Sequence, residues 1–281
     1  MRSAVVWSIV WTAIGVAFGA LVLLLADGEL AGEYLAGFLI EKSLSLDNLF
    51  VFAVLFTFFA VPDSQRQRVL VLGIAGAIVL RALFIFAGAA ALDSFHAMTY
   101  VLGALLAVTA VKIARHGGGE MEPEGSLPMR FLRRTLKLAP DYDGDKLWTR
   151  VDGHRAATPL LAALLMIAAF DVMFAIDSIP AIFAVTRDTF IVFAANAFSL
   201  LGMVSLFFLL DGLLARFRYL HLGLAAILGY VGAKLVLVDV WHPPIGLSLA
   251  VVAGALLVAA LASMVAERRD GHDVAGPARA G

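Results

Sequence analysis

Two pairs of acidic residues stand inside stretches of sequence that are otherwise apolar. Glu41 and Asp47 form the first pair and Asp171 and Asp177 the second, and the second member of each pair lies six positions after the first. A carboxylate at the centre of a membrane helix costs about 2.5–3.5 kcal/mol even on a lenient insertion scale. These acids are therefore expected to be protonated, paired or bound to a cation, and they are the first candidates for chemistry.

Neutral oxygen-bearing side chains accompany both pairs. Asn48 directly follows Asp47, and Ser178 directly follows Asp177. Carboxylate, amide and hydroxyl oxygens suit hard divalent cations such as Mg²⁺, Ca²⁺ and Mn²⁺. The chain has no Cys, which excludes thiolate metal sites and Cys nucleophiles. We expect a transported cation rather than a permanently bound cofactor, with proton exchange as a hypothesis for the coupling because buried paired carboxylates hold protons readily.

Internal ion pairing is the alternative explanation for these acids. Basic residues also lie inside the apolar stretches, namely Lys42, Arg81, Lys112 and Lys234. Arg81 is the best placed of them, because it lies in the middle of its stretch, and such pairing is expected to absorb one or two of the acids.

Helix geometry limits a site built from these pairs. Six residues along an α-helix correspond to about 9 Å of rise and about 240° of rotation, so the two acids of one helix do not share a face. One solution is that Asp47 meets Asp177 across two helices. The other is a broken helix that exposes backbone carbonyls, which Pro180 favours.

The elements that carry these residues are predicted from hydropathy. The chain is 62% hydrophobic and 15% charged, with a mean hydropathy of +0.93, which is typical of an integral membrane protein. Its net charge of −1 gives no bulk basic field for nucleic acid. The sequence predicts an all-α membrane protein with a transmembrane domain over residues 1–266. About eight spans are expected, at 4–25, 34–60, 69–92, 97–115, 157–185, 189–210, 219–239 and 243–265.

The distribution of Lys and Arg predicts the orientation in a cell membrane. Nearly all loop Lys and Arg residues fall on one side of this arrangement, whereas Arg187 alone lies on the other. The positive-inside rule then places both termini and the 116–156 loop in the cytoplasm. We expect residues 267–281 to be a disordered cytoplasmic tail. The opposite face is acidic and would concentrate cations.

The long loop at 116–156 interrupts the hydrophobic pattern. A solvated connector is the favoured interpretation. The alternative is a short amphipathic helix over Phe131–Leu138 on the inner leaflet, because basic residues alternate there with Leu and Phe. A cytoplasmic partner would be expected to bind at this loop.

A weak internal repeat relates the two halves of the chain. The segment from Glu41 to Asn48 resembles the segment from Asp171 to Ser178, and Leu102–Lys112 resembles Leu224–Lys234. Equivalent spans are three crossings apart, so the repeat must be inverted in the membrane. Two inverted three-helix repeats are an architecture of transporters, with the site near the midplane.

At these residues the sequence resembles the TerC/Alx family of integral membrane proteins. The matching stretches are EKSLSLDNLFV from Glu41, VLVLGIAGAIVLRA from Val69 and DVMFAIDSIPAIFAVT from Asp171. The resemblance implies a manganese exporter, and the family name refers to tellurium resistance. It also implies that the ion path is lined by Glu41, Asp47, Asn48, Asp171, Asp177 and Ser178. Two residues depart from the family pattern: Ala168 stands where an acid is expected and Val204 where a base is expected.

These observations predict a divalent cation exporter, with Mn²⁺ the first candidate and protons the candidate coupling ion. The rival hypothesis is a non-transporting membrane scaffold of a metal-stress or tellurite-resistance complex. An enzyme is not expected, because the sequence has no HExxH motif and no phosphate-binding glycine loop after a strand.

Overall fold

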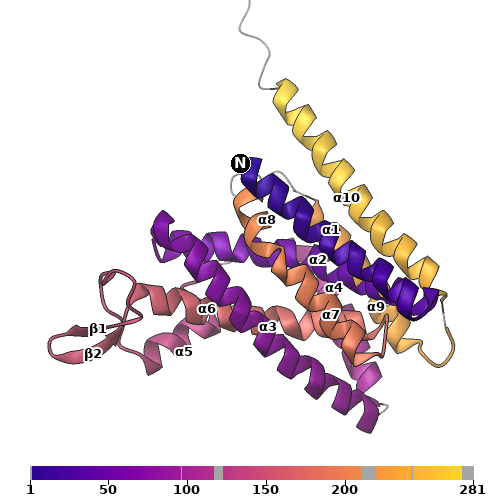
Figure 1. Cartoon of the computed structure of the whole chain (residues 1–281), viewed down its shortest axis with the longest axis horizontal. Helices are drawn as coiled ribbons and strands as arrows, with labels where there is room; N and C mark the ends of the chain where they lie inside the picture. The colour runs from indigo at the N-terminus through magenta and orange to yellow at the C-terminus, as the bar shows by residue number, and fades with distance from the viewer. Residues whose placement is uncertain (1, 96, 117–122, 211–218, 242, 274–281) are drawn as a thin grey trace, which may run out of the picture.

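The apolar stretches of the sequence form the long helices of the molecule (Figure 1). The computed structural model describes residues 2–95, 97–116, 123–210, 219–241 and 243–273. In chain order the long helical elements are α1 (Arg2–Leu25), α2 (Gly28–Phe58), α3 (Asp63–Ser94), α4 (Ala97–His116), α6 (Pro159–Phe183), α7 (Thr189–Leu201), α8 (Met203–Leu210), α9 (Leu220–Val236) and α10 (Ile245–Asp273).

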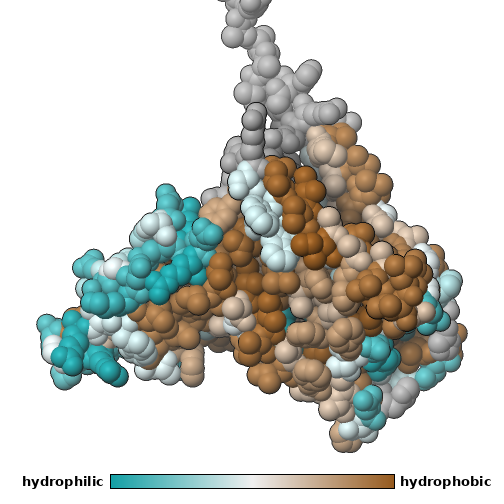
Figure 2. Space-filling view, in the orientation of Figure 1, coloured by the Kyte–Doolittle hydropathy of each residue, from teal (hydrophilic) through white to brown (hydrophobic). Residues whose placement is uncertain are grey.

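Each of the eight predicted spans coincides with one of these helices or, for 189–210, with two. That span is divided at Gly202 into α7 and α8. Among the described residues, six helical segments are long and apolar enough to cross a membrane, namely α1, α3, α4, α6, the α7–α8 segment and α10. Helix α9 is shorter, and α2 carries Glu41, Lys42 and Asp47 close together. Figure 2 shows that the surface over the helix bundle is mainly apolar, as a multi-pass membrane protein requires.

Helix α10 does not end at the predicted boundary near residue 265. Its backbone remains helical to Asp273, into the segment that we expect to be a tail, and residues 274–281 lie outside the described part of the chain. Glu and Arg are good helix formers, which explains how a helix can continue beyond the apolar stretch.

Four helices pack together at the centre of the bundle. Helices α2 and α3 each pack against both α6 and α7. Helix α4 packs along α9, and the closest approach involves Gly103 and Gly232. A methyl group added at Gly232 would lie 3.0 Å from both the Gly103 carbonyl oxygen and the Ala107 nitrogen. Small residues at membrane-helix crossings permit such close backbone contact.

The remaining long helices cover the outside of this core. Helix α1 packs on α2, α7 and α8, and α10 packs on α2 and α9. Each therefore has one face against the bundle and one that is free for lipid.

The 116–156 loop contains a small folded unit, which we call the loop subdomain and define as residues 123–158. It consists of α5 (Leu127–Thr135) followed by an antiparallel hairpin of β1 (Trp148–Val151) and β2 (His154–Ala157). The hairpin is an exception to the all-helical prediction. Its turn residues Asp152 and Gly153 have φ angles of 50° and 76°. Asp-Gly is a strong hairpin signal because both turn positions need a positive φ.

The described part of the loop is therefore more structured than a solvated connector. A short helix was the alternative prediction, and α5 begins four residues earlier than the predicted Phe131–Leu138 and ends at Thr135. Its N-terminus is capped by Ser126, whose hydroxyl accepts from the Met129 nitrogen at 3.3 Å.

The loop subdomain is attached to the turn between α2 and α3. The Tyr142 hydroxyl donates to the Phe59 carbonyl at 2.8 Å, and the Gln65 amide donates to the Gly144 carbonyl at 2.9 Å. At the opposite end of the bundle, the Thr186 hydroxyl donates to Glu33 at 2.5 Å. Loops that are predicted to share one side of the membrane are thus neighbours in space.

Apolar side chains form two main clusters at different depths. One includes Leu55, Leu70 and Ala163 near the loop subdomain, and the other includes Ile85 and Ile182 toward the opposite end. Along α3 the first cluster ends at Ile78 and the second begins at Ile85, with Arg81 between them. A layer of polar side chains therefore separates two apolar cores.

Candidate functional site

Arg81 lies at the centre of the polar layer and is almost completely buried, with 1% of its surface exposed. Its guanidinium donates to Asp171 of α6, with an Nη2–Oδ1 distance of 3.0 Å. It also pairs with Glu41 of α2 and donates to the Asn196 side-chain oxygen of α7 at 2.8 Å. One cation from α3 thus contacts side chains of the three other central helices, α2, α6 and α7.

Two further oxygens complete the surroundings of the guanidinium. The Ser178 hydroxyl lies 3.4 Å from Arg81 Nη1. With the Asn48 amide oriented to satisfy both of its groups, its oxygen accepts from Arg81 Nη2 at 3.1 Å and its nitrogen donates to the Leu44 carbonyl. We call the set of Glu41, Asn48, Arg81, Asp171, Ser178 and Asn196 the Arg81 layer.

The Arg81 layer carries more negative than positive charge when its groups are ionised. Glu41 and Asp171 are both 0% exposed, and Arg81 is the cation that contacts them. The Oε2 atom of Glu41 is buried and has no hydrogen-bond partner. An unsatisfied buried carboxylate oxygen is costly, so it is a place where a proton or a cation would be stabilised.

Heptad spacing explains how the sequence assembles this layer. Glu41 and Asn48 are seven residues apart on α2, and Asp171 and Ser178 are seven apart on α6. Seven residues make about two helical turns, so each pair shares a face. The internal ion pairing considered as the alternative is present for Glu41 and Asp171.

Asp177 lies outside the Arg81 layer, on another side of α6. It accepts a hydrogen bond from the Thr109 hydroxyl of α4 at 3.1 Å, and it is within the electrostatic influence of Lys112. Thr109 is a functional candidate that the sequence analysis missed, and no spacing in the sequence pointed to it. The side chain of Asp47 lies outside the described residues, although its backbone belongs to α2.

The direction of the helices separates Asp47 from Asp177 along the membrane normal. Glu41 and Asp171 lie at one level because both contact Arg81. Asp47 is six residues toward the end of α2 at the loop subdomain, and Asp177 is six residues toward the opposite end of α6. The two positions are therefore roughly 18 Å apart along the helices. This geometry does not favour their direct meeting.

The proposed break in α6 is also absent within its described length. Helix α6 continues through Pro180 to Phe183. Over the described residues, no three His, Asp or Glu side chains come together as a group that could hold a metal ion. Instead, four predicted site residues belong to the Arg81 layer, and the positions of Asp47 and Asp177 lie on opposite sides of that layer.

A cavity of 390 Å³ lies beyond Asp177, at the end of the bundle opposite the loop subdomain. It is lined by charged residues of both signs, Glu33, Arg187, Asp188 and Lys234, together with apolar side chains of α6 and α9. It lies at the C-terminal end of α6, on the side of the Arg81 layer where Asp177 also lies.

The two departures from the family pattern lie on different helices, α6 and α8. Ala168 is partly buried on α6, one turn before Asp171. Val204 of α8 packs against the apolar cluster on the side of the loop subdomain.

Comparison with known proteins covers nearly the whole chain. Residues 26–271 match the model of the integral membrane protein TerC family. A membrane protein of Myxococcus xanthus is 45% identical over 95% of this chain and 84% of its own length. The Alx protein of Escherichia coli K12, named as a candidate membrane-bound redox modulator, is 41% identical over 92% of this chain and 83% of its own length.

A membrane protein of Mycobacterium tuberculosis is 44% identical over 84% of this chain, which corresponds to 61% of that longer relative. No solved structure matches the chain. The length of the family match and the identity to these relatives show that the chain belongs to the TerC family of integral membrane proteins.

Proposed function

We propose that this protein exports a divalent metal cation, with Mn²⁺ the expected ion, and that the Arg81 layer is its intramembrane binding site. The observation that carries the proposal is the pairing of two fully buried carboxylates, Glu41 and Asp171, with the single guanidinium of Arg81. The excess negative charge and the free Oε2 atom of Glu41 favour a visiting cation.

Arg81 acts in this proposal as an internal substitute for the cargo. A divalent ion that enters the layer competes with the guanidinium for Glu41 and Asp171, and the neutral oxygens of Asn48, Ser178 and Asn196 are available as further ligands. This oxygen set suits Mn²⁺ better than it suits soft cations. When the ion leaves, Arg81 pairs with the acids again, so they are not left unpaired in the low-dielectric interior.

The acids outside the layer extend the proposed path in both directions. Asp47 lies on the loop-subdomain side and Asp177 on the other, where the cavity with Glu33 and Asp188 follows. A cation moving outward would meet an acid at each of these levels. Protons are the candidate counter-ion, because the same carboxylates can carry either species.

An inverted repeat fits this arrangement. Helix α2 packs on α6, and α4 packs on α9, so each helix contacts its proposed equivalent in the other half. Glu41 and Ser178 contact Arg81 Nη1, and Asp171 and Asn48 contact Nη2, so each nitrogen is shared by one residue from each half of the chain. Repeats related by an axis in the membrane plane commonly meet at the transport site.

Transport in vesicles tests the proposal. Purified protein is reconstituted in liposomes, and Mn²⁺ uptake is followed with a dye that the metal quenches. We expect uptake by the wild type, and near-background rates for Glu41→Gln and Asp171→Asn. Asp93→Asn is the matched control, because Asp93 is an exposed acid of α3 outside the layer and should leave the rate unchanged. Wild-type protein that moves no Mn²⁺ would contradict the proposal.

The rival function is a membrane scaffold that docks partners through the loop subdomain. The observation in its favour is that residues 123–158 form a folded unit attached to the bundle. A scaffold predicts no flux in liposomes and loss of the cellular phenotype on deletion of the loop subdomain. A redox role, which the name of the E. coli relative suggests, would not use thiols of this chain, because it has no Cys.

A further inference from the structure

Helix α5 presents an uncovered face that combines apolar and cationic side chains. Leu127 and Phe131 are 76% and 70% exposed, and they lie four residues apart. Arg130 and Arg134 lie on the same side of the helix, because residues three, four and seven apart on a helix fall on one face. The other face is occupied by Met129 and Leu132, which are 1% and 5% exposed. The exposed face is therefore not a poorly packed core face.

The depth of α5 is determined by what its buried face contacts. Met129 and Leu132 belong to the same apolar cluster as Leu160 in the first turn of α6 and Leu55 near the end of α2. Those residues lie where the membrane-crossing helices begin or end. Helix α5 is thus held at the edge of the apolar belt, next to the headgroups of a surrounding leaflet.

The charges around α5 are unequally matched. The acids Glu124 and Asp145 pair with Arg133 and Arg68, at 3.0 Å and 3.2 Å. Within the described part of the chain, no ion pair is found for Arg130 or Arg134. Among the described residues, the uncovered face thus offers two arginines that neither Glu124 nor Asp145 pairs with.

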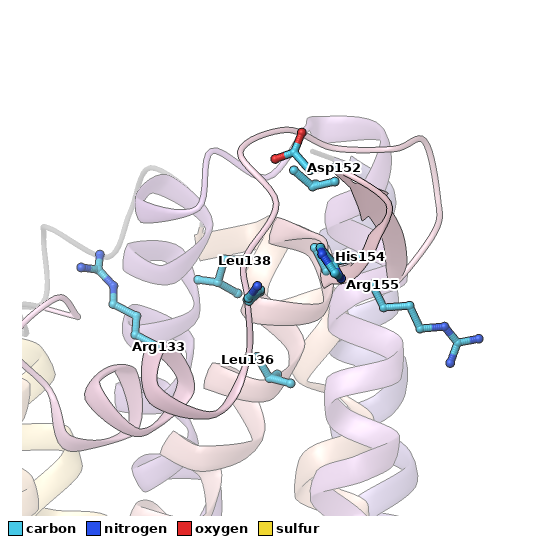
Figure 3. A pocket seen from close by; sticks show the side chains of 9 residues that line it. Arg133, Leu136, Leu138, Asp152, His154 and Arg155 are labelled. Atoms are coloured by element: carbon cyan, nitrogen blue, oxygen red, sulfur yellow. The ribbon is translucent and has the colours of Figure 1, made fainter.

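Basic residues continue beyond α5 around an adjoining cavity. Figure 3 shows Arg133 and Arg155 extending from opposite sides of this cavity between α5 and the β-hairpin. It has a volume of 560 Å³ and its lining also includes Lys137 and His154, with Asp152 as the acid. The positive surface is therefore shared by α5 and the hairpin.

We infer that the exposed face of α5 binds the surface of an anionic phospholipid leaflet. Leu127 and Phe131 insert between the headgroups, and Arg130 and Arg134 bind their phosphate groups. An interfacial helix needs this combination of an apolar contact and cations, because electrostatic attraction adds to a modest apolar insertion. Each arginine should contribute roughly a five-fold preference for anionic over neutral lipid.

The absence of Cys from the sequence permits a clean depth measurement. The full-length protein carries a nitroxide at Leu127→Cys and is reconstituted in vesicles of phosphatidylcholine alone or with phosphatidylglycerol. Collision of the nitroxide with a water-soluble nickel chelate is compared with its collision with oxygen, which concentrates in the bilayer. Asp141→Cys, an exposed site after α5, is the matched control.

We expect phosphatidylglycerol to shift the label at 127 from nickel to oxygen accessibility, with no shift at 141. The double variant Arg130→Gln/Arg134→Gln should lose roughly twenty-five-fold of the preference, and high salt should reduce it as well. A label at 127 that remains equally exposed to nickel in both vesicles overturns the inference. Protection already present in detergent also overturns it, because it would indicate contact between two copies of the protein.

Discussion

The Arg81 layer and the loop subdomain use the same kinds of ion pairs in opposite environments. In the layer, Arg81 pairs with Glu41 and Asp171, and all three side chains are at most 1% exposed. In the loop subdomain, Arg68 pairs with Asp145 at 3.2 Å, with 48% and 73% of the side chains exposed. Breaking the buried pairs should therefore cost more stability than breaking the exposed pair, because solvent screens the charges of the exposed pair.

The largest expected effect is the removal of the central cation. Arg81→Met leaves Glu41 and Asp171 buried without their partner, and it should lower stability by about 3–5 kcal/mol. Thermal unfolding of the purified protein in detergent measures the loss. A triple variant that also carries Glu41→Gln and Asp171→Asn should recover most of the stability. A triple variant no more stable than Arg81→Met would show that charge pairing is not what Arg81 contributes.

The acids above and below the layer should affect transport more than folding. Asp47→Asn and Asp177→Asn are each expected to slow Mn²⁺ export by about tenfold or more, because a charged ligand contributes at least 1.5 kcal/mol. Cells that depend on the protein should then become sensitive to excess manganese, with normal amounts of protein in the membrane. Wild-type tolerance in both variants would end the manganese assignment.

A hydrogen bond that attaches the loop subdomain to the end of α2 gives a smaller effect that depends on pH. Burial raises the pKa of Tyr142 to about 12, and its hydroxyl donates to the Phe59 carbonyl. Because the folded pKa lies above the ordinary value of 10.0, the protonated hydroxyl contributes its full stability below pH 10. This contribution is lost as the pH rises through 10 toward 12.

Tyr142→Phe provides the control for this titration. It should cost about 0.5–1.5 kcal/mol at neutral pH, the usual net contribution of one hydrogen bond. It should also remove part of the alkaline loss of stability, measured by unfolding at a series of pH values. If the wild type and Tyr142→Phe lost stability in parallel above pH 10, Tyr142 would not be the titrating group.

The smallest expected effect belongs to the exposed pair. Arg68→Met should change stability by no more than about 0.5 kcal/mol, since surface ion pairs contribute little. Unfolding under the same conditions as Arg81→Met gives a direct comparison of the two arginines. A loss at Arg68 as large as that at Arg81 would remove the distinction between the two regions.

The sequence predicts the helices of this chain better than it predicts the contacts between them. The eight predicted spans are helical because a long apolar stretch satisfies its backbone only within a helix when lipid surrounds it. Hydropathy does not predict the β-hairpin, because its strands are short and polar. The local signal for it is the turn sequence Asp152-Gly153. The orientation and the transported ion remain predictions.

The metal-binding role of the predicted site residues stays a prediction, whereas the structure shows which of them lie together. Four residues of the predicted ion path contact Arg81, namely Glu41, Asn48, Asp171 and Ser178. Arg81 is also the residue that the sequence predicts as the partner of one or two acids. The six-residue spacing drew attention to Asp47 and Asp177, whereas the seven-residue spacing selects the shared face. Thr109 was not foreseen, because it reaches Asp177 from another helix.

By itself, the sequence determined that this is a multi-pass helical membrane protein with acids deep in its spans, because hydropathy and charge are properties of local segments. Only the tertiary structure decided which acids meet. Four helices had to cross at one depth before Arg81 could contact Glu41, Asp171 and Asn196 together. The rotation and direction of each helix depend on packing against its neighbours, and no single segment carries that information.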